Sequence, residues 1–342
     1  MLLRTLPDLK TAPMNTDDWK RTERLLTVET AAFNGQDFPM IDAVPSVDLK
    51  HGFLHATRTF SRRRDLWIGD HKPFLFLENP LVSAIMVIET MLEACAILHP
   101  LLKPVAVRDI WFFDVIECPS DSSQDISITC RTVSQDATTV TCQTEIFTED
   151  AKSLKGTGSG KPHYKAQVVM GSTVILPPRI DANLAEFDSI ESAPPITRSQ
   201  IVEQYEMRSG MKDRYRVMDS MEFTGGGTVK ARSIYKHWQD FSDQTSHKYH
   251  YPPYLLEALM QASNFYLVAR DPSSVRSLIP YHMGELIFTR NCADNETLII
   301  EGRVMHEGDD GITWEAHARD QSGEIIMIAR KVMFRWFAGS RT

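Results

Sequence analysis

The segment from Ser83 to about His99 restricts the fold most strongly, because a helix formed there is apolar on nearly every side. At 1.5 Å per residue, its roughly 17 residues span ~25 Å. A helix with no polar face must be covered all round, and a strongly curved antiparallel sheet provides such a cover. Glu89, Glu93 and His99 interrupt the apolar run, which therefore predicts a buried helix of a globular protein and not a membrane span.

The order of elements repeats along the chain. The helical segment Ile88–Ala94 returns as Leu256–Ala262, and segments of alternating apolar and polar residues follow each copy. This alternation indicates half-buried antiparallel strands. The matching strand segments are Val107–Phe112 with Met283–Phe288, and Ile126–Arg131 with Leu298–Arg303. Each half therefore predicts one long apolar helix followed by three or four antiparallel strands, which is an α+β fold.

The chain divides into four predicted regions. We expect an N-terminal extension at residues 1–37, a first folded unit at 38–170, a linker at 171–199 and a second folded unit at 200–342. The linker is assigned because prolines and acidic residues gather between the two copies of the repeat.

Charge and cysteine content exclude several classes of protein. The sequence has 37 Lys and Arg residues against 45 Asp and Glu residues, a net charge of −8, so nucleic acid is not an expected partner. The five cysteines include no Cys-x-x-Cys pair and fit neither a disulfide framework nor a zinc module. We therefore expect no metal ion, a reducing compartment and a cytoplasmic location, in keeping with an N-terminus that lacks a secretory apolar segment.

Residues 69–93 contain an ordered set of motif residues. They are His71, Pro73, Asn79, Pro80 and, on the predicted helix, Glu89. This order resembles the active-site segment of hydroxyacyl carrier-protein dehydratases. Ser83-Ala84 stands where that family has Pro-Gly, and Glu93 stands where it has Gln. The segment between the histidine and the asparagine is also a few residues longer than in the family.

The second half carries a matching motif. Residues 253–261 read PYLLEALMQ, which is similar to the His-Pro-x-Leu-Leu-Asp-x-x-x-Gln motif of dehydratase domains in polyketide and polyunsaturated fatty acid synthases. Glu257 replaces the usual Asp, and Gln261 is retained. The resemblance covers roughly residues 38–337 and implies a double hotdog fold, in which each of two units wraps a curved antiparallel sheet around a long apolar helix. The family's Tyr-Gly-Pro motif is missing, and Tyr215 is the stand-in for its tyrosine.

The resemblance implies a reaction and the residues for it. Removing water from a 3-hydroxyacyl thioester requires a base for the α proton, an acid for the departing hydroxide and a donor for the enolate oxygen. His71 from the first unit is the implied base. Glu257 from the second unit is the implied acid, because burial beside an apolar helix favours a protonated carboxyl group. Gln261, one helical turn later on the same face, is expected to orient either that carboxyl group or the leaving hydroxyl group.

Further residues are expected to support or bind the substrate. They are Pro80, Ser83, Ala84, Glu89 and Tyr215. The backbone amides at Ser83 and Ala84 begin the predicted helix, where amides without an intrahelical partner can face the thioester oxygen.

An enzyme of this family takes its substrate from an acyl carrier protein, whose phosphopantetheine arm carries the acyl chain, and it needs no other cofactor. We expect that partner, a homodimer and no membrane association. The residues also leave alternatives open. The missing Tyr-Gly-Pro motif favours a catalytically silent double hotdog that binds acyl chains or acts as a scaffold. A further alternative is a double-bond isomerase or a thioesterase that binds its acyl substrate in the same tunnel as the dehydratase.

Overall fold

The computed structural model of the chain describes residues 38–120, 122–148, 162–172, 195–225, 228–235, 249–270 and 276–338. The predicted N-terminal extension at 1–37 and most of the predicted linker, residues 173–194, lie outside the described residues. The described elements form two sets, one ending at Gly171 and one beginning at Arg198, so the second set starts two residues inside the predicted linker of 171–199.

The first set comprises β1 (Ala43–Asp48), β2 (Phe53–Ser61), α2 (Leu66–Asp70), α3 (Ala84–Leu98), β3 (Lys103–Phe112), β4 (Ser123–Gln135), β5 (Thr139–Thr148) and β6 (Tyr164–Gly171). The second set comprises α4 (Arg198–Arg208), the 3₁₀ helix η1 (Asp213–Tyr215), β7 (Ser220–Gly225), β8 (Thr228–Ile234), α5 (Pro253–Arg270), β9 (Arg276–Phe288), β10 (Thr297–Gly308), β11 (Gly311–Arg319) and β12 (Ile325–Ala338).

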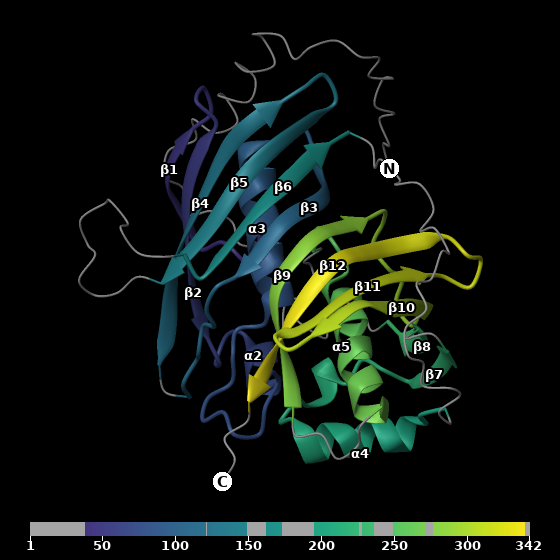
Figure 1. Cartoon of the computed structure of the whole chain (residues 1–342). Helices are drawn as coiled ribbons and strands as arrows, with labels where there is room; N and C mark the ends of the chain where they lie inside the picture. Colours follow the sequence, from purple (N-terminus) through teal and green to yellow (C-terminus); the bar gives the residue numbers. More distant parts are fainter. Residues whose placement is uncertain are drawn as a thin grey trace, which may run out of the picture.

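The strands of both sets join in one antiparallel sheet (Figure 1), in the order β1-β2-β4-β5-β6-β3-β9-β12-β11-β10-β8-β7. The two sets share one strand order. If the six strands of a set are numbered along the chain, they lie in the order first, second, fourth, fifth, sixth and third from the outer edge of the sheet to its centre. The two halves meet where β3 pairs with β9, with Ala106 opposite Ile287 and Arg108 opposite Glu285. The predicted repeat and the predicted α+β class are confirmed.

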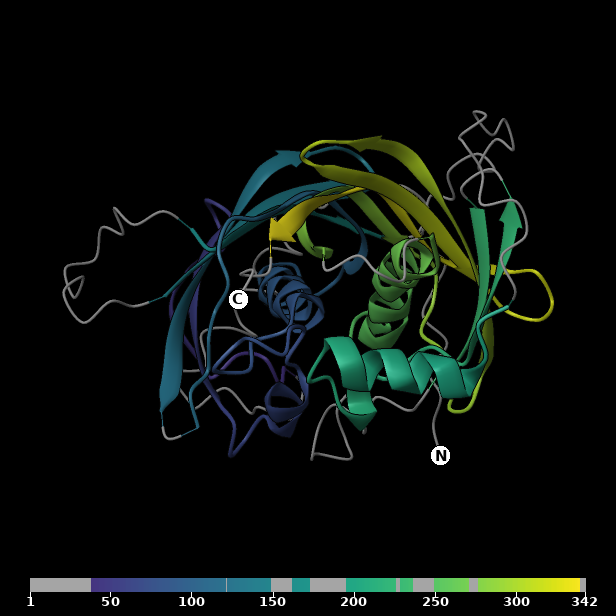
Figure 2. The ribbon, with the colours of Figure 1, turned by 60° about the horizontal axis from the view of Figure 1, so that its bottom comes forward.

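The sheet arches over the two long helices (Figure 2). Helix α3 packs against β2 to β6, helix α5 packs against β8 and β10 to β12, and the two helices contact each other. All residues of α3 from Ile85 to Leu98 are buried, so the predicted all-round cover of this helix is confirmed. In the part of the chain that the structure describes, no helix is long and apolar enough to cross a membrane.

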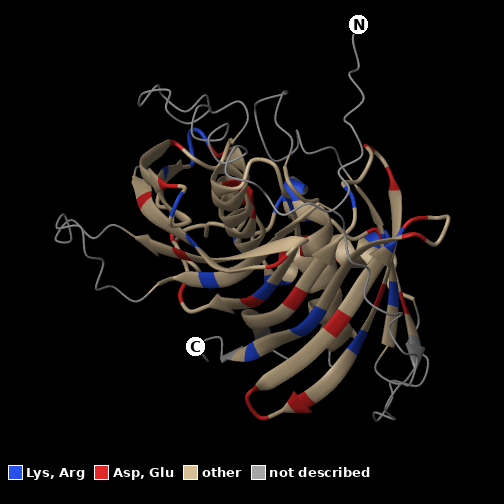
Figure 3. Ribbon diagram, turned by 90° about the horizontal axis from the view of Figure 1, so that it is seen from above, with Lys and Arg blue, Asp and Glu red and all other residues tan. Residues whose placement is uncertain are grey.

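The outer face of the sheet carries charges of both signs on neighbouring strands (Figure 3). One row of alternating sign crosses the junction between the halves, through Arg303, Glu315, Arg330, Glu285 and Arg108. Its successive members are 2.9, 3.5, 3.3 and 3.0 Å apart at their nearest charged atoms. Partly exposed cross-strand pairs of this kind contribute about 0.2–1 kcal/mol each. Their main effect is to favour this register of the strands over a slipped one.

Candidate active site

His71 is the first residue after α2, and its backbone N–H bonds to the carbonyl of Ile68 in that helix. Its ring is buried, and Nδ1 donates a 2.9 Å hydrogen bond to the carbonyl oxygen of Leu81. Because a carbonyl oxygen only accepts, the ring proton sits on Nδ1 and the free lone pair on Nε2. Burial lowers the pKa of His71 to about 4, so the ring is neutral at pH 7 and Nε2 is able to accept a proton.

The loop between His71 and α3 fixes the carbonyl that orients this ring. The backbone N–H of Leu81 donates to the carbonyl of His71 at 3.0 Å. The preceding residue, Pro80, is buried, and its carbonyl accepts a 3.0 Å hydrogen bond from the N–H of Cys118. Pro80, a predicted supporting residue, thus directly precedes Leu81, whose carbonyl oxygen accepts the hydrogen bond from the His71 ring.

Glu257 lies on the first part of α5, and its side chain is only 4% exposed. Burial raises the pKa of Glu257 to about 7, against the opposing effect of a hydrogen bond from Gln261. That bond runs from Nε2 of Gln261 to Oε1 of Glu257 over 2.7 Å. A carboxyl group with this pKa is largely protonated below neutral pH and can donate a proton there.

Gln261 is held at both ends of its amide group. Its Nε2 also donates to the carbonyl of Tyr215 at 2.9 Å, and its Oε1 accepts a hydrogen bond from the hydroxyl of Tyr205. Tyr205 lies on α4, which begins at Arg198, inside the predicted linker. The sequence analysis did not select Tyr205, because its partner Gln261 is 56 residues away in the sequence. The capping box formed by Thr197 and Gln200 at the start of α4 is the signal that marks this helix in the sequence.

Residues 210–214, just before Tyr215, contact the first half of the chain. They bind Asp70 and Lys72, the residues on either side of His71 in the sequence. Lys212 N–H donates to the carbonyl of Asp70 at 3.0 Å, and Gly210 N–H donates to the carbonyl of Lys72 at 2.8 Å. Arg214 adds an ion pair of 2.5 Å to the Asp70 carboxylate. A Cβ at Gly210 would lie 2.9 Å from the Lys72 side chain, so glycine permits this close approach.

This docking places Tyr215 against the predicted base. The ring of Tyr215 is fully buried, and its centroid lies 4.7 Å from that of His71. Burial raises the pKa of the Tyr215 hydroxyl well above its usual value, against the opposing effect of the neighbouring Ser83 hydroxyl. Ser83 is the N-cap of α3, and Ala84 is the first residue of that helix. The N-terminal end of α3, where backbone amides have no intrahelical partner, therefore lies beside Tyr215.

Glu89 lies elsewhere on α3, in a second group of buried polar residues. Its Oε1 accepts hydrogen bonds from the backbone N–H and Nδ1 of His250, at 2.8 and 2.9 Å. Oε2 of Glu93 accepts a 2.7 Å hydrogen bond from the N–H of Met40. Burial, and then the charge of Glu89, raise the pKa of Glu93 well above its usual value. The hydrogen bonds of Glu89 thus hold His250, which the sequence analysis did not select as its partner.

The structure brings the predicted base and acid into one continuous set of contacts across the two halves. His71 packs on Tyr215, the carbonyl of Tyr215 accepts from Gln261, and Gln261 donates to Glu257. Ser83 lies beside the same tyrosine. The arrangement offers a neutral imidazole, a carboxyl group whose pKa is raised to about 7 and the backbone amides at the start of a helix, which are the elements of acid–base chemistry on a carbonyl compound.

Two units, each a curved sheet around a long helix and joined edge to edge, define a double hotdog protein. Solved structures of this class are similar over nearly their whole length. The dehydratase domain from the CurK module of Curacin polyketide synthase matches with a TM-score of 0.66 and 14% identity, covering 88% of this chain and 99% of that one. A trans-AT polyketide synthase dehydratase domain from Brevibacillus brevis matches with a TM-score of 0.67 and 13% identity, covering 88% and 98%.

A third match is the dehydratase domain of the polyketide PpsC from Mycobacterium tuberculosis, with a TM-score of 0.64, 13% identity and coverage of 88% and 99%. The likeness confirms the predicted double hotdog fold. No family model matches the sequence, and no curated protein matches it either.

Proposed function

We propose that this chain is a dehydratase that converts a 3-hydroxyacyl thioester into the 2-enoyl thioester in polyketide or fatty acid biosynthesis. The observation that supports this function is that two buried titratable groups, one from each half of the chain, are linked through Tyr215 and Gln261. His71 is neutral with its lone pair on Nε2, and Glu257 has a pKa raised to about 7. The similar solved structures are themselves dehydratase domains of polyketide synthases.

In the proposed reaction, Nε2 of His71 takes the α proton of the thioester. The bond from the β carbon to the hydroxyl group breaks, and Glu257 gives its proton to that hydroxyl, so that water leaves and the double bond forms. The Nδ1 hydrogen bond to the carbonyl of Leu81 stabilises the imidazolium ring that results. Each half of the chain thus supplies one of the two proton-transfer groups.

Other residues prepare these groups. Gln261 fixes the carboxyl group of Glu257 and is itself fixed by the hydroxyl of Tyr205. Amides at the start of α3, at Ser83 and Ala84, are proposed to stabilise the negative charge that develops on the thioester oxygen. Tyr215 takes the place of the tyrosine in the missing Tyr-Gly-Pro motif and positions both His71 and Gln261.

The proposed substrate carrier is an acyl carrier protein, with the acyl chain on its phosphopantetheine arm, and the chemistry above requires no other cofactor. We further propose a homodimer, because two-fold dimers are the commonest symmetric assembly among homo-oligomers. Light scattering at micromolar concentration tests the assembly. A single species with twice the mass of the 38.9 kDa chain is expected, and a fully active monomer contradicts it.

The decisive experiment for the function is an assay of the purified chain with a 3-hydroxyacyl pantetheine thioester, followed by mass spectrometry. Loss of one water with retention of the thioester is expected. Hydrolysis of the thioester, or migration of the double bond in an enoyl thioester without dehydration, supports the thioesterase or isomerase instead. Binding of an acyl pantetheine without any turnover supports a catalytically silent acyl-binding domain.

A further inference from the structure

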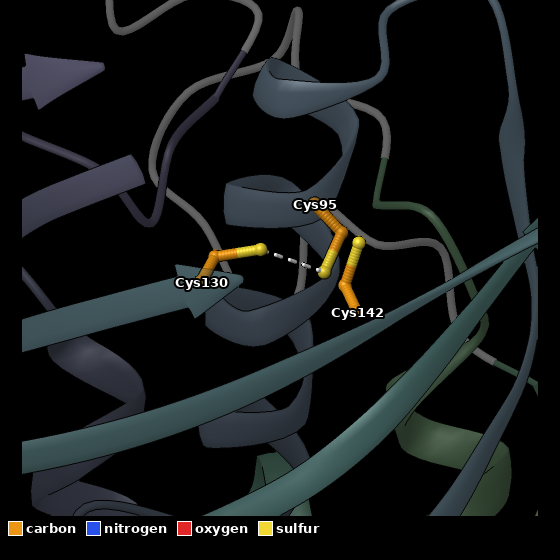
Figure 4. Close-up of side chains that lie close together, drawn as sticks. All are labelled: Cys95, Cys130 and Cys142. Atoms are coloured by element: carbon orange, nitrogen blue, oxygen red, sulfur yellow. Dashed lines mark hydrogen bonds between the residues drawn. The ribbon is translucent and has the colours of Figure 1, made fainter. Parts of the chain in front are cut away.

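A cluster of three buried thiols lies near the C-terminal end of α3, the end opposite Ser83. Cys95 of α3, Cys130 of β4 and Cys142 of β5 are each fully buried, and their sulfur atoms all lie within 4.8 Å of one another (Figure 4). The sulfur atoms of Cys95 and Cys130 are 3.5 Å apart. A helix and the two strands of the β4–β5 hairpin thus bring their three thiols together.

A nitrogen donor borders this cluster. His99 is the C-cap residue of α3, one helical turn after Cys95, and its ring is 6% exposed. Nε2 of His99 lies 2.9 Å from the hydroxyl of Thr132, and that hydroxyl oxygen lies 4.0 Å from the sulfur of Cys142. Because Nε2 of His99 faces the hydroxyl of Thr132, the imidazole would have to rotate away from Thr132 to become a fourth ligand beside the three sulfur atoms.

We propose that Cys95, Cys130, Cys142 and His99 form a structural zinc site. Zinc in structural sites is tetrahedral, with Cys₃His among its usual ligand sets and Zn–S distances of about 2.3 Å. Two sulfur atoms on such a tetrahedron lie ~3.8 Å apart, close to the 3.5 Å between Cys95 and Cys130. Binding forms three Zn–S bonds and one Zn–N bond and releases the three thiol protons to solvent.

The chemistry of the ligands favours zinc over harder metal ions. Three thiolates and an imidazole suit zinc, whereas calcium and magnesium require oxygen ligands. After His99 turns to the metal, the hydroxyl of Thr132 remains beside Cys142 and can donate to its thiolate. The proposed ligands come from a helix and two strands and not from one short loop. For this reason the sequence shows no zinc-binding motif.

The proposed site is independent of the proposed reaction. The helix from Ser83, beside Tyr215, to Cys95 is ~18 Å long at 1.5 Å per residue. Zinc at its far end would tie the C-terminus of α3 to the sheet through β4 and β5. We therefore expect zinc to raise the stability of the fold and to leave the turnover of correctly folded protein unchanged.

The test uses the full chain purified from cells grown with added zinc and freed of loosely bound metal. Elemental analysis is expected to find about one zinc ion per chain. Cys95→Ser, Cys130→Ser and Cys142→Ser should each lose that zinc. Cys118→Ser and Cys292→Ser are the matched controls, because these two cysteines lie outside the cluster, and both should keep it.

A second measurement does not depend on the folding of a variant. Metal-free wild-type protein titrated with Co²⁺ should develop thiolate-to-cobalt charge-transfer absorption that saturates at one equivalent and disappears when Zn²⁺ is added. Zinc removal should also lower the melting temperature. The proposal is overturned if wild-type protein binds neither metal, if its intact mass shows a disulfide between two of the three cysteines, or if all three serine variants retain zinc.

Discussion

The side-chain amide of Gln261 donates a 2.7 Å hydrogen bond to the carboxyl group of Glu257, one helical turn earlier on α5. This bond favours the ionised carboxyl group, while burial favours the protonated one and raises the pKa to about 7. The balance between these two effects decides what fraction of Glu257 can donate a proton at neutral pH. Gln261 is therefore a positioning residue that also tunes the proposed acid.

Replacing Gln261 by Leu is expected to raise the pKa of Glu257 further, because the hydrogen bond that lowers it is lost. One hydrogen bond to a charged group corresponds to a shift of roughly one pH unit or more. The alkaline limb of the kcat/KM profile should move upward by that amount, and kcat should fall because the carboxyl group loses its orientation. Tyr205→Phe is the control, since it removes the bond to Oε1 of Gln261 and leaves the bond to Glu257. An unmoved or lowered alkaline limb in Gln261→Leu contradicts this role.

The wild-type enzyme is expected to show a bell-shaped pH profile of kcat/KM. The proposed base must be neutral, and the pKa of His71 is lowered to about 4, so activity should rise as the pH increases through that value. The proposed acid must be protonated, and the pKa of Glu257 is raised to about 7, so activity should fall as the pH increases through that value. A profile that still rises above pH 8 would exclude Glu257 as the acid.

Protein stability provides the control for this profile. The pKa of Glu257 is raised from 4.5 to about 7 by burial in the folded state, so the stability that comes from its protonated form is complete below pH 4.5. That contribution is lost as the pH rises through about 7. The melting temperature of the wild type should fall over this range relative to that of Glu257→Gln, which cannot ionise.

His71→Ala and Glu257→Ala are each expected to lower kcat by roughly 10²–10⁴, because each removes one proton-transfer group of the pair. The double variant should be little slower than either single variant, since the two groups act in one step. Single-turnover kinetics with a 3-hydroxyacyl pantetheine thioester measure the loss, and circular dichroism checks the fold. Near wild-type turnover in either variant removes that residue from the mechanism.

The sequence predicts the parts of this molecule that depend on short-range patterns. The helix from Ser83 and the alternating strands follow from hydrophobic periodicity, which a buried helix and a half-buried strand impose locally. Glu257 and Gln261 are recognisable together because one helical turn separates them. The order of the strands in the two halves repeats for the same reason, since each half has the same pattern of elements.

Contacts between distant segments could not be predicted in this way. Tyr205 reaches Gln261 from a helix that begins in the predicted linker, and His250 reaches Glu89 from the other half of the chain. Tertiary packing determines these contacts, so the spacing of residues in the sequence does not predict which side chains meet. The same is true of the cysteine cluster, whose members come from a helix and two strands.

Glu89→Gln is expected to reduce dehydration far less than Glu257→Gln. The Oε1 atom of Glu89 accepts two hydrogen bonds from His250, and a glutamine oxygen can accept the same bonds. Glu257→Gln, in contrast, removes the transferable proton of the proposed acid. The measurement is kcat for dehydration, compared between the two variants under the same conditions. A larger loss in Glu89→Gln would assign the acid to the first half of the chain, as in single-hotdog dehydratases.

Glu93→Gln should preserve the fold at pH 5 and should be more stable than the wild type once the pH exceeds the raised pKa of Glu93. Burial and then the charge of Glu89 raise the pKa of Glu93 well above its usual 4.5, so the native carboxyl group is neutral at pH 5, as a glutamine is. The stability that this neutral form provides is complete below pH 4.5 and is lost as the pH rises through the raised pKa. Only the wild type suffers that loss.

Glu93→Ala is the contrasting variant. It removes the oxygen that accepts from the N–H of Met40, and a buried donor left without an acceptor costs about 1–3 kcal/mol, in addition to the cavity that the substitution leaves. Urea unfolding of the three proteins at pH 5 and pH 9 separates the two effects. If Glu93→Gln loses as much stability at pH 5 as Glu93→Ala, the carboxyl group is ionised in the fold. Glu93 then differs in charge from the glutamine that hydroxyacyl carrier-protein dehydratases have at the resembling position.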